Sequence, residues 1–286
     1  MKIDINTKMI TLLGKPLGQS FAARMQNAGY EAAGLNMLYF YTEVDKDHLG
    51  DVVNGLRYMN FAGFAVTKPN KVRVLRYLDE LDPLCKKMGA SNTVVKTPEG
   101  KLIGYNTDGV GFYTSLVEEG KINVEESTFF CFGAGGAGRA MCSVLAYHGA
   151  KKIYITDFYE PCAESLVMDI NENFAPVAEL VHHGDYAKIA ECNVVMNASG
   201  IGMGSTIGQT PMPVEHIQPG QFYFAACYNP DKTQFLLNAE EKGCQVLNGL
   251  GMSLYQGAAQ IELWTGEKAP VEAMRKELMD ILAESK

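Results

Sequence analysis

The stretch Phe129-Phe130-Cys131-Phe132-Gly133-Ala134-Gly135-Gly136-Ala137-Gly138 decides the fold of this 286-residue chain. Its four leading apolar residues predict a short buried strand, and the pattern G-x-G-x-x-G follows at once. A helical pattern then runs from Arg139 to His148, and a second strand, Lys152 to Thr156, ends at Asp157. The acid lies 19 residues after the last glycine of the pattern. This order of strand, glycine loop, helix, strand and acid is the one that binds a dinucleotide.

Each glycine of the loop has a physical task in such a site. Gly133 permits a tight turn, Gly135 lets the backbone approach a pyrophosphate, and Gly138 lets the helix pack closely on the strand. The N-terminus of the helix adds unpaired N–H groups. The alternative is a purely structural glycine turn in a chain with 29 glycines. The cofactor contacts predicted for the loop are at Gly133, Gly135, Gly136, Ala137 and Gly138.

Asp157 bears on which cofactor binds. A carboxylate at the end of the second strand accepts hydrogen bonds from the ribose hydroxyls of NAD and repels the additional phosphate of NADP. Residues 158–161 contain no arginine to neutralise that phosphate. The alternative is an acid at the N-terminus of a helix predicted over 161–170. We expect NAD, with NADP as the second candidate.

Composition excludes several classes of function. The chain has 33 acidic and 25 basic residues, a net charge of −8, and no basic run, so nucleic acid and anionic membrane surfaces are poor partners. No apolar run approaches the roughly 20 residues that span a bilayer. Residues 1–6 contain no apolar signal core, so we expect a cytoplasmic protein. With 47% hydrophobic residues, the chain has room for two domains with cores of their own.

Cysteine and histidine give no indication of a metal site. The seven cysteines are scattered without a C-x-x-C pair, which is typical of reduced, buried thiols. The only histidine pair, His182-His183, lies in a polar turn, where a solvated loop is the simpler interpretation. We therefore predict no bound metal.

The first half of the chain alternates strands with helices, which predicts a mostly parallel sheet covered on both faces. Residues 99–101 read as a hairpin tip between two strands. The predicted strands are 9–13, 37–42, 63–66 and 93–96, and the predicted helices are 21–33, 47–57, 69–78 and 108–119.

The second half continues the nucleotide domain with strands at 194–197 and 222–226. The last two helices, 253–264 and 271–282, exceed what a dinucleotide domain needs, so we expect them to return to the first domain. This predicts an α/β protein with a substrate domain at 1–107 plus 252–286 and a doubly wound, Rossmann-type nucleotide domain at 108–251. We expect the active site in a cleft between the two.

Three polar stretches of the first half are candidates for chemistry. In Gly63–Lys71 a strand ends and presents Thr67 and Lys71, at the end of the sheet where α/β proteins bind ligands. Ser91-Asn92-Thr93 and Gly104–Gly109 are the other two. Each has a plain alternative. On the local sequence alone, an exposed helix lysine is the preferred interpretation of Lys71, and Asp108 can be the N-cap of the next helix.

Together these stretches resemble the shikimate/quinate dehydrogenase family, essentially from end to end. The resemblance is carried by the following segments: Gly14–Ser20, Met25–Ala28, Val66–Lys71, Ser91–Thr93, Gly104–Gly109, the glycine loop, Asn197–Met203, Tyr228–Pro230 with Thr233, Asn248–Met252 and Gln256–Ala258.

The resemblance implies reversible oxidation of a ring hydroxyl of shikimate or quinate, with Lys71 and Asp108 as the catalytic pair. Removing hydride from carbon requires the hydroxyl proton to leave too, and a neutral lysine amine can accept it. By the same resemblance, the polar substrate lining comprises Ser20, Thr67, Asn92, Tyr228 and Gln256. Further cofactor contacts are implied at Ser199, Gly249 and Met252. A place in the shikimate pathway of aromatic amino acid biosynthesis is also implied.

The chain departs from the family at residues that bind the substrate carboxylate in the family. The family shows S-x-S followed by proline, whereas here the second serine is Ala22 and the proline is Ala23. A missing hydroxyl to a carboxylate costs about 1.5–3 kcal/mol. The residue before Pro69, normally apolar, is Lys68, which is a candidate to bind a carboxylate in place of the serine. Two further differences are Ala65 for an asparagine and Ala225 for an aspartate.

Three alternatives stay open at this point. The first is a family member that acts on another hydroxy acid, and the second is a non-catalytic nucleotide-sensing protein. Retention of Lys71, Asp108 and Asn92 argues against a sensor, since sensing needs no proton-transfer pair. The third concerns assembly, where a monomer and a homodimer are both compatible with the sequence.

Overall fold

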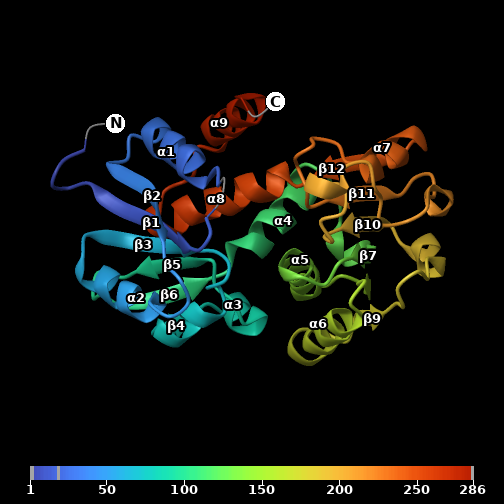
Figure 1. Ribbon diagram of the computed structural model, residues 1–286, viewed down its shortest axis with the longest axis horizontal. Coiled ribbons are helices and arrows are strands. Elements are labelled where there is room, and N and C mark those ends of the chain that lie inside the picture. The colour runs from blue at the N-terminus through green and yellow to red at the C-terminus, as the bar shows by residue number, and fades with distance from the viewer. Residues whose placement is uncertain (1–2, 18–19, 285–286) are drawn as a thin grey trace. The chain divides into compact units, whose positions relative to one another are not determined.

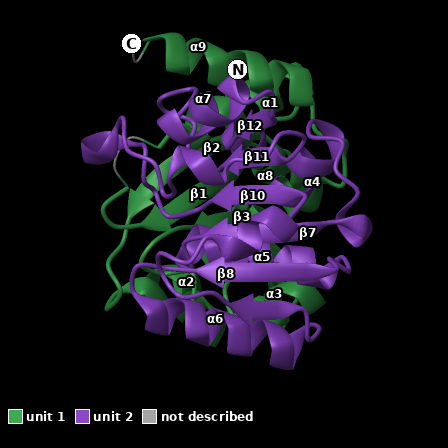
Figure 2. Cartoon of the chain, turned by 90° about the vertical axis from the view of Figure 1, so that its right-hand side faces the viewer, with its two compact units in different colours: residues 1–111, 254–286 green, residues 112–253 purple. Residues whose placement is uncertain are grey.

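The computed structural model describes residues 3–17 and 20–284, in which two compact units are formed. Unit 1 comprises Met1–Gly111 and Leu254–Lys286, and unit 2 comprises Phe112–Ser253 (Figure 2). The boundaries fall within two helices, α4 (Thr107–Glu118) and α8 (Leu250–Thr265). None of the described helices has the length and apolarity to cross a membrane.

Unit 1 contains a six-stranded sheet in the order β2-β1-β3-β5-β6-β4. Its strands are β1 (Lys8–Gly14), β2 (Met37–Glu43), β3 (Phe61–Val66), β4 (Glu80–Leu81), β5 (Thr93–Lys96) and β6 (Leu102–Tyr105). The sheet is mixed, because β1 pairs in parallel with β2 and β3 whereas β5 is antiparallel to both β3 and β6. The expectation of a mostly parallel sheet therefore holds for the pairs β1–β2, β1–β3 and β4–β6, and it is wrong for both pairs that β5 makes. The hairpin predicted at residues 99–101 connects β5 to β6 and makes these two strands antiparallel.

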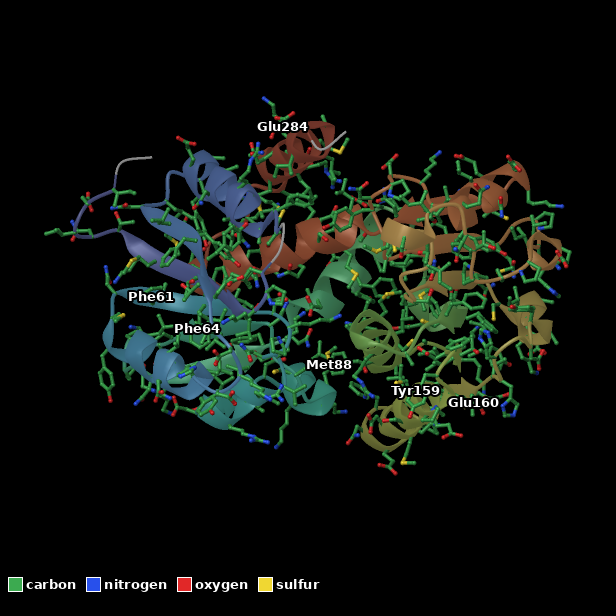
Figure 3. The ribbon with its side chains drawn as sticks, viewed as in Figure 1. Phe61, Phe64, Met88, Tyr159, Glu160 and Glu284 are labelled. Atoms are coloured by element: carbon green, nitrogen blue, oxygen red, sulfur yellow. The ribbon has the colours of Figure 1, made fainter. Side chains whose placement is uncertain are left out.

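The helices of unit 1 bury apolar faces against this sheet and against each other. Besides the unit 1 parts of α4 and α8 they are α1 (Ala22–Ala32), α2 (Leu49–Tyr58), α3 (Pro83–Met88) and α9 (Val271–Glu284) (Figure 1). Phe61 and Phe64 lie on β3 (Figure 3) and belong to a buried cluster with Leu49 and Val53 of α2. Helix α1 lies against α9, where Arg24 donates to Glu277 over 2.8 Å.

One predicted helix of unit 1 is wrong. Residues 69–78 do not form an α-helix but a turn followed by a short 3₁₀ helix, Arg73–Tyr77. The side chain of Asn70 explains part of this, since it is buried and donates to the carbonyl of Val44 across 3.1 Å. That contact fixes the segment against a neighbouring loop, and local side-chain bonds of asparagine compete with helix formation. The short elements α3 and β4 were not predicted.

Strand β2 is an edge of the unit 1 sheet, and a side chain covers part of it. The amide of Asn27 on α1 donates to the carbonyl of Tyr39 and accepts from its N–H, both at 2.8 Å. One amide therefore satisfies both main-chain groups of this residue.

Unit 2 contains a six-stranded, wholly parallel sheet in the order β12-β11-β10-β7-β8-β9. Its strands are β7 (Thr128–Phe132), β8 (Lys152–Thr156), β9 (Ala178–Leu180), β10 (Val194–Asn197), β11 (Phe222–Ala225) and β12 (Gln245–Asn248). The helices between them are α5 (Gly136–Tyr147), α6 (Glu160–Asn173) and α7 (Gln234–Glu241). The neighbours of β7 are β8 and β10, so the chain order reverses at β7, which is where doubly wound sheets bind ligands.

Both faces of β7 are buried, as a parallel sheet requires. Phe130 and Phe132 pack in a cluster with Phe235 and Leu236 of α7. The alternate residues Phe129 and Cys131 are also fully buried, and they face the other side of the sheet. The continuous apolar run of β7 thus fixes the strand whose end carries the glycine loop.

Candidate functional site

The glycine loop has the geometry that its sequence predicts. Gly133 has φ +100°, and a Cβ there would lie 2.6 Å from the backbone nitrogen of Ser199. A Cβ on Gly138 would lie 1.8 Å from the carbonyl oxygen of Gly133, so helix and loop touch at this point. At Gly135, the N-cap of α5, a Cβ would meet no atom of another segment within 4 Å. The loop is therefore closed where it packs and open where a phosphate group would approach.

The carboxylate of Asp157 accepts hydrogen bonds from the backbone of the glycine loop and from the backbone of its own connection to α6. Oδ2 accepts from the N–H of Ala134 at 2.7 Å, and Oδ1 accepts from the N–H of Tyr159 at 2.8 Å. Helix α6 begins at Glu160 with Tyr159 as its N-cap, and both residues are labelled in Figure 3. Asp157 thus orders the connection from β8 to α6 and lies outside the helix. Its half-buried carboxylate still faces the cavity described next.

A cavity of about 580 Å³ opens at the carboxyl ends of β7, β8 and β10. Among its lining residues are Gly133, Gly135, Asp157 and Ser199, four of the residues predicted for the cofactor. The lining does not include Gly136, Ala137 and Gly138, in the first turn of α5, or Gly249 and Met252. Ser199 is held in place because its hydroxyl donates to Oδ1 of Asn197 over 2.6 Å.

Several residues of this cavity were not predicted. Phe158 is 87% exposed and its ring contacts that of His183 edge-on, with 5.4 Å between the centroids. Tyr186, Ile201 and Thr210 complete this part of the lining. The position of Phe158, directly after Asp157, was the only indication in the sequence. Tyr186 and Thr210 come from the loops after β9 and β10, which no local pattern identifies, whereas Ile201 lies inside the quoted segment Asn197–Met203 but had no assigned task.

The second group of predicted residues meets in unit 1. Nζ of Lys71 donates to Oδ2 of Asp108 at 2.6 Å, and Nδ2 of Asn92 donates to Oδ1 of the same carboxylate at 2.9 Å. The side chains of Lys71 and Asp108 are 30% and 22% exposed. The interpretation of Asp108 as an N-cap is wrong. Helix α4 starts at Thr107, and the oxygen of Asn106 accepts the Gly109 N–H at 3.4 Å, so Asp108 is free for the ion pair.

A buried network of hydrogen bonds fixes the amide oxygen of Asn92. Its Oδ1 accepts from the N–H of Thr107 at 2.7 Å, and Gln256 donates to the hydroxyl of the same threonine at 3.3 Å. Thr93 bonds Oδ1 of Asn92 as well and in turn accepts from Gln260 at 2.8 Å. The sequence did not assign tasks to Thr107, Thr93 or Gln260. They fix the amide orientation that lets Nδ2 of Asn92 face the carboxylate.

The remaining predicted substrate residues have separate positions. Thr67 follows the end of β3, and its N–H donates to the carbonyl of Leu13 at the end of β1. Ser20 precedes α1, and its hydroxyl accepts from the N–H of Ala22 at 3.3 Å. Tyr228 belongs to unit 2, where burial raises the pKa of its phenol while a hydrogen bond with Ser253 lowers it.

The residues in which the chain departs from the family differ in their exposure. Ala22 is half-buried in the first turn of α1, next to Ser20. Lys68 is exposed beside Thr67, and its carbonyl accepts from the N–H of Lys15 at 3.3 Å. Ala65 and Ala225 are fully buried within β3 and β11, and alanine fits there without a polar partner.

The described residues include no group of three histidine, cysteine, aspartate or glutamate side chains that could hold a metal ion. All seven cysteines are free, and only Cys162 is exposed.

Comparison with known proteins matches an N-terminal and a C-terminal segment of the chain, both almost wholly in unit 1, to one family. Residues 12–94 match the shikimate dehydrogenase substrate binding domain, and residues 249–279 match the shikimate 5'-dehydrogenase C-terminal domain. A shikimate dehydrogenase (NADP(+)) of Desulforamulus reducens is 39% identical over 97% of this chain and 96% of its own length.

Solved structures agree over almost the whole chain. Shikimate 5-dehydrogenase from Listeria monocytogenes, in complex with shikimate and NAD, has a TM-score of 0.93 and 37% identity and covers 97% of this chain and 98% of its own. The 5-ketofructose reductase of Gluconobacter sp. strain CHM43 has a TM-score of 0.89 and 31% identity, over 97% and 100% of the two chains. With full-length relatives above 30% identity, this chain belongs to the shikimate dehydrogenase family.

Proposed function

We propose that this protein catalyses the reversible, NAD(P)-linked oxidation of a ring hydroxyl of shikimate or quinate to the 3-dehydro ketone. The observation that carries the proposal is the cluster of Lys71, Asp108 and Asn92 in unit 1. An amine and a carboxylate 2.6 Å apart, both partly exposed, are suited to transfer a proton and to bind adjacent hydroxyls. We assign substrate binding to unit 1 and cofactor binding to unit 2.

The fit of a nicotinamide dinucleotide to unit 2 rests on the glycine loop. Gly135 leaves room for a pyrophosphate beside the N-terminus of α5, whereas a side chain at Gly133 or Gly138 would collide with backbone. When bound, the nicotinamide supplies a hydride acceptor. We assign cofactor contacts inside the cavity to Gly133, Gly135 and Ser199. We assign cofactor contacts outside the cavity lining to Gly136, Ala137, Gly138, Gly249 and Met252.

The residues of unit 1 divide the work at the reacting hydroxyl. Lys71 in its neutral form accepts the hydroxyl proton at Nζ as the hydride leaves, and returns it in the reverse direction. Asp108 holds Nζ in place and accepts a hydrogen bond from a neighbouring substrate hydroxyl. Asn92, locked by Thr107, presents its amide to another hydroxyl. Gln256, Thr67 and Ser20 complete the polar lining in unit 1, and Tyr228 of unit 2 is assigned separately to substrate binding.

We further propose that NAD is preferred over NADP. The carboxylate of Asp157 lines the cavity, and the neighbouring lining residues Thr156, Phe158 and Ser199 bring no cation to bind an additional phosphate. A carboxylate there accepts ribose hydroxyls and repels the phosphate of NADP.

A second candidate is oxidation of a different hydroxy compound. It is favoured by Ala22, which cannot supply the second hydroxyl for a carboxylate, and by the likeness to a 5-ketofructose reductase. Initial rates with shikimate and quinate, each with NAD and NADP, test the proposal. Turnover of either acid with NAD above NADP supports it. Binding of NAD without oxidation of either acid indicates the second candidate or a non-catalytic sensor.

A further inference from the structure

The phenol of Tyr41 bridges the two sides of the segment that carries Ser20. Tyr41 lies on β2, and its hydroxyl donates to the carbonyl of Ser20 at 2.5 Å and accepts from the N–H of Ala23 at 2.9 Å. Its ring is 39% exposed and meets that of Tyr39 edge-on, with 6.5 Å between the centroids. Donor and acceptor capacities of one hydroxyl are therefore both used on the start of α1.

The contact with Ala23 depends on a residue in which this chain departs from its family. A proline at this position has no N–H, whereas alanine in the first turn of α1 presents a donor that the helix itself cannot satisfy. The hydroxyl of Tyr41 satisfies that donor. The bond also restrains a segment that would otherwise lose the rigidity of the proline.

The bridge leaves Ser20 in a defined state. Its carbonyl is held by Tyr41, and its hydroxyl oxygen accepts from the N–H of Ala22 at 3.3 Å. An accepted N–H occupies a lone pair and leaves the O–H proton to be donated, which is what a carboxylate requires. With alanine at position 22, Ser20 is the serine that remains of the S-x-S pattern.

We propose that Tyr41 is a positioning residue for carboxylate recognition, which acts by fixing Ser20 at the start of α1. The inference rests on the proposed function, because it requires a substrate with a carboxylate. The one proton of the Tyr41 hydroxyl is donated to Ser20, so this hydroxyl has no donor left for the acid and acts on it through the geometry of Ser20. The affinity for the acid then depends on Tyr41, and the chemical step does not.

Replacement Tyr41→Phe removes the bridge and little else. We expect KM for shikimate or quinate to rise about three- to tenfold, the effect of one or two hydrogen bonds. The kcat value and the KM for NAD should stay within twofold, because the loss affects ground state and transition state equally. Tyr58→Phe, at a tyrosine that is 84% exposed in the same unit, is the matched control and should change nothing.

Two double mutants distinguish positioning from general destabilisation. In a Ser20→Ala background, Tyr41→Phe should add less than twofold to KM, because the residue through which it acts is gone. In an Ala23→Pro background its effect should also shrink, because proline removes the donor and restores rigidity. Effects of Tyr41→Phe that multiply fully with Ser20→Ala would overturn the proposal.

The outcomes separate this inference from the proposed function. Wild-type protein that oxidises neither acid contradicts the proposed function and the role of Tyr41 with it. Active wild-type protein whose KM for the acid is unchanged by Tyr41→Phe contradicts the role of Tyr41 alone.

Discussion

Nζ of Lys71 lies 2.6 Å from Oδ2 of Asp108, and the other oxygen of that carboxylate accepts from Asn92. These residues come from three separate segments: the turn after β3, the residue before β5 and the first turn of α4. A surface ion pair needs no such support. Here the amide of Asn92 is oriented by a buried threonine network, which indicates that the direction of each polar group matters.

Lys71→Ala should lower kcat by a factor on the order of 10²–10⁴, the usual range for general acid–base groups. The affinity for NAD should stay nearly unchanged, since the residues proposed to bind the cofactor belong to unit 2. Steady-state rates together with calorimetric titration of NAD measure both. Lys101→Ala is the control, because Lys101 also pairs with a carboxylate, that of Glu80 at 2.7 Å, but on the surface. A Lys71→Ala variant whose kcat is within threefold of the wild-type value would show that Lys71 has no role in proton transfer and is a surface lysine.

The double replacement Asp157→Ser with Phe158→Arg should narrow or reverse the preference for NAD. It removes the repulsion of the additional phosphate and adds an arginine that can bind it. The ratio of kcat/KM for NAD and NADP is the measurement. Tyr159→Arg, next to the cavity lining, controls for added charge alone. A wild-type preference for NADP would show that Asp157 does not face the ribose.

Ala22→Ser should lower KM for shikimate or quinate roughly tenfold, by restoring one charge-assisted hydrogen bond. The kcat value should change little, because a contact to the carboxylate is made equally in the ground state and the transition state. Ala32→Ser on the exposed face of the same helix is the control. An unchanged KM in an enzyme that oxidises these acids well would mean that position 22 does not face the carboxylate.

If Ala22→Ser rescues nothing and neither acid is oxidised, Lys68 is the next residue to change. Lys68→Ile restores the apolar residue of the family next to Thr67. If Lys68 binds the carboxylate of another hydroxy acid, this change should abolish the activity toward that acid. Activity toward that acid that survives the change would exclude Lys68 from binding it.

Gly135→Ala and Gly138→Ala should separate cofactor binding from folding. A Cβ at Gly135 meets no atom of another segment within 4 Å, so the melting temperature should hold while the Kd for NAD rises about tenfold or more. A Cβ at Gly138 lies 1.8 Å from the oxygen of Gly133, so this variant should unfold at a clearly lower temperature. Equal effects of both on melting would contradict the assignment of Gly135.

Unit 2 should become less stable as the pH falls, because the unfolded state binds a proton at His148 more readily than the folded state does. Burial lowers the pKa of this imidazole below 6.5, and its ring stacks on Tyr113 with 3.7 Å between the centroids. Because the unfolded state then binds more protons, stability is complete above about pH 6.5 and is lost as the pH falls toward the lower, folded pKa. His148→Gln should therefore flatten the decline of the melting temperature as the pH falls below about 6.5.

His48 provides a control of opposite sign. Its pKa is raised by the hydrogen bond with Asp45, so it contributes stability below pH 6.5 that is lost as the pH rises. His48→Gln should steepen the decline toward acid pH, if only slightly at this exposed position. Identical curves for the His148 variant and wild type would show that the ring titrates as it does in the unfolded chain.

Local patterns in the sequence were sufficient for the first part of unit 2, whereas β9, α7 and β12 were not predicted. The strand β7, the glycine loop, α5 and β8 were all predicted close to their observed bounds, because a parallel strand buried on both faces is a continuous apolar run. Helix starts were displaced by a few residues, as at α5, where the glycines themselves form the first turn. The mixed sheet of unit 1 was less accessible, because the antiparallel place of β5 is set by pairing between distant segments.

The candidate site shows the same division. Lys71, Asp108 and Asn92 were identified from family motifs, and their proximity follows from the fold. The residues that support them, Thr107 and Gln260, were inside or near quoted motifs but had no assigned task, since hydrogen bonds across 15 to 167 residues leave no periodic trace. The ring contact between Phe158 and His183 was missed because it joins loops after two different strands.

The amide of Asn27 has a consequence for association. By bonding both main-chain groups of Tyr39, it occupies a place on the outer edge of β2 that a strand from another molecule would need. An exposed edge is a template for intermolecular sheet growth, and a side chain that mimics the missing strand interrupts it. Replacing Asn27 by leucine would uncover that template, so the first effect we would look for is aggregation on storage rather than a loss of turnover.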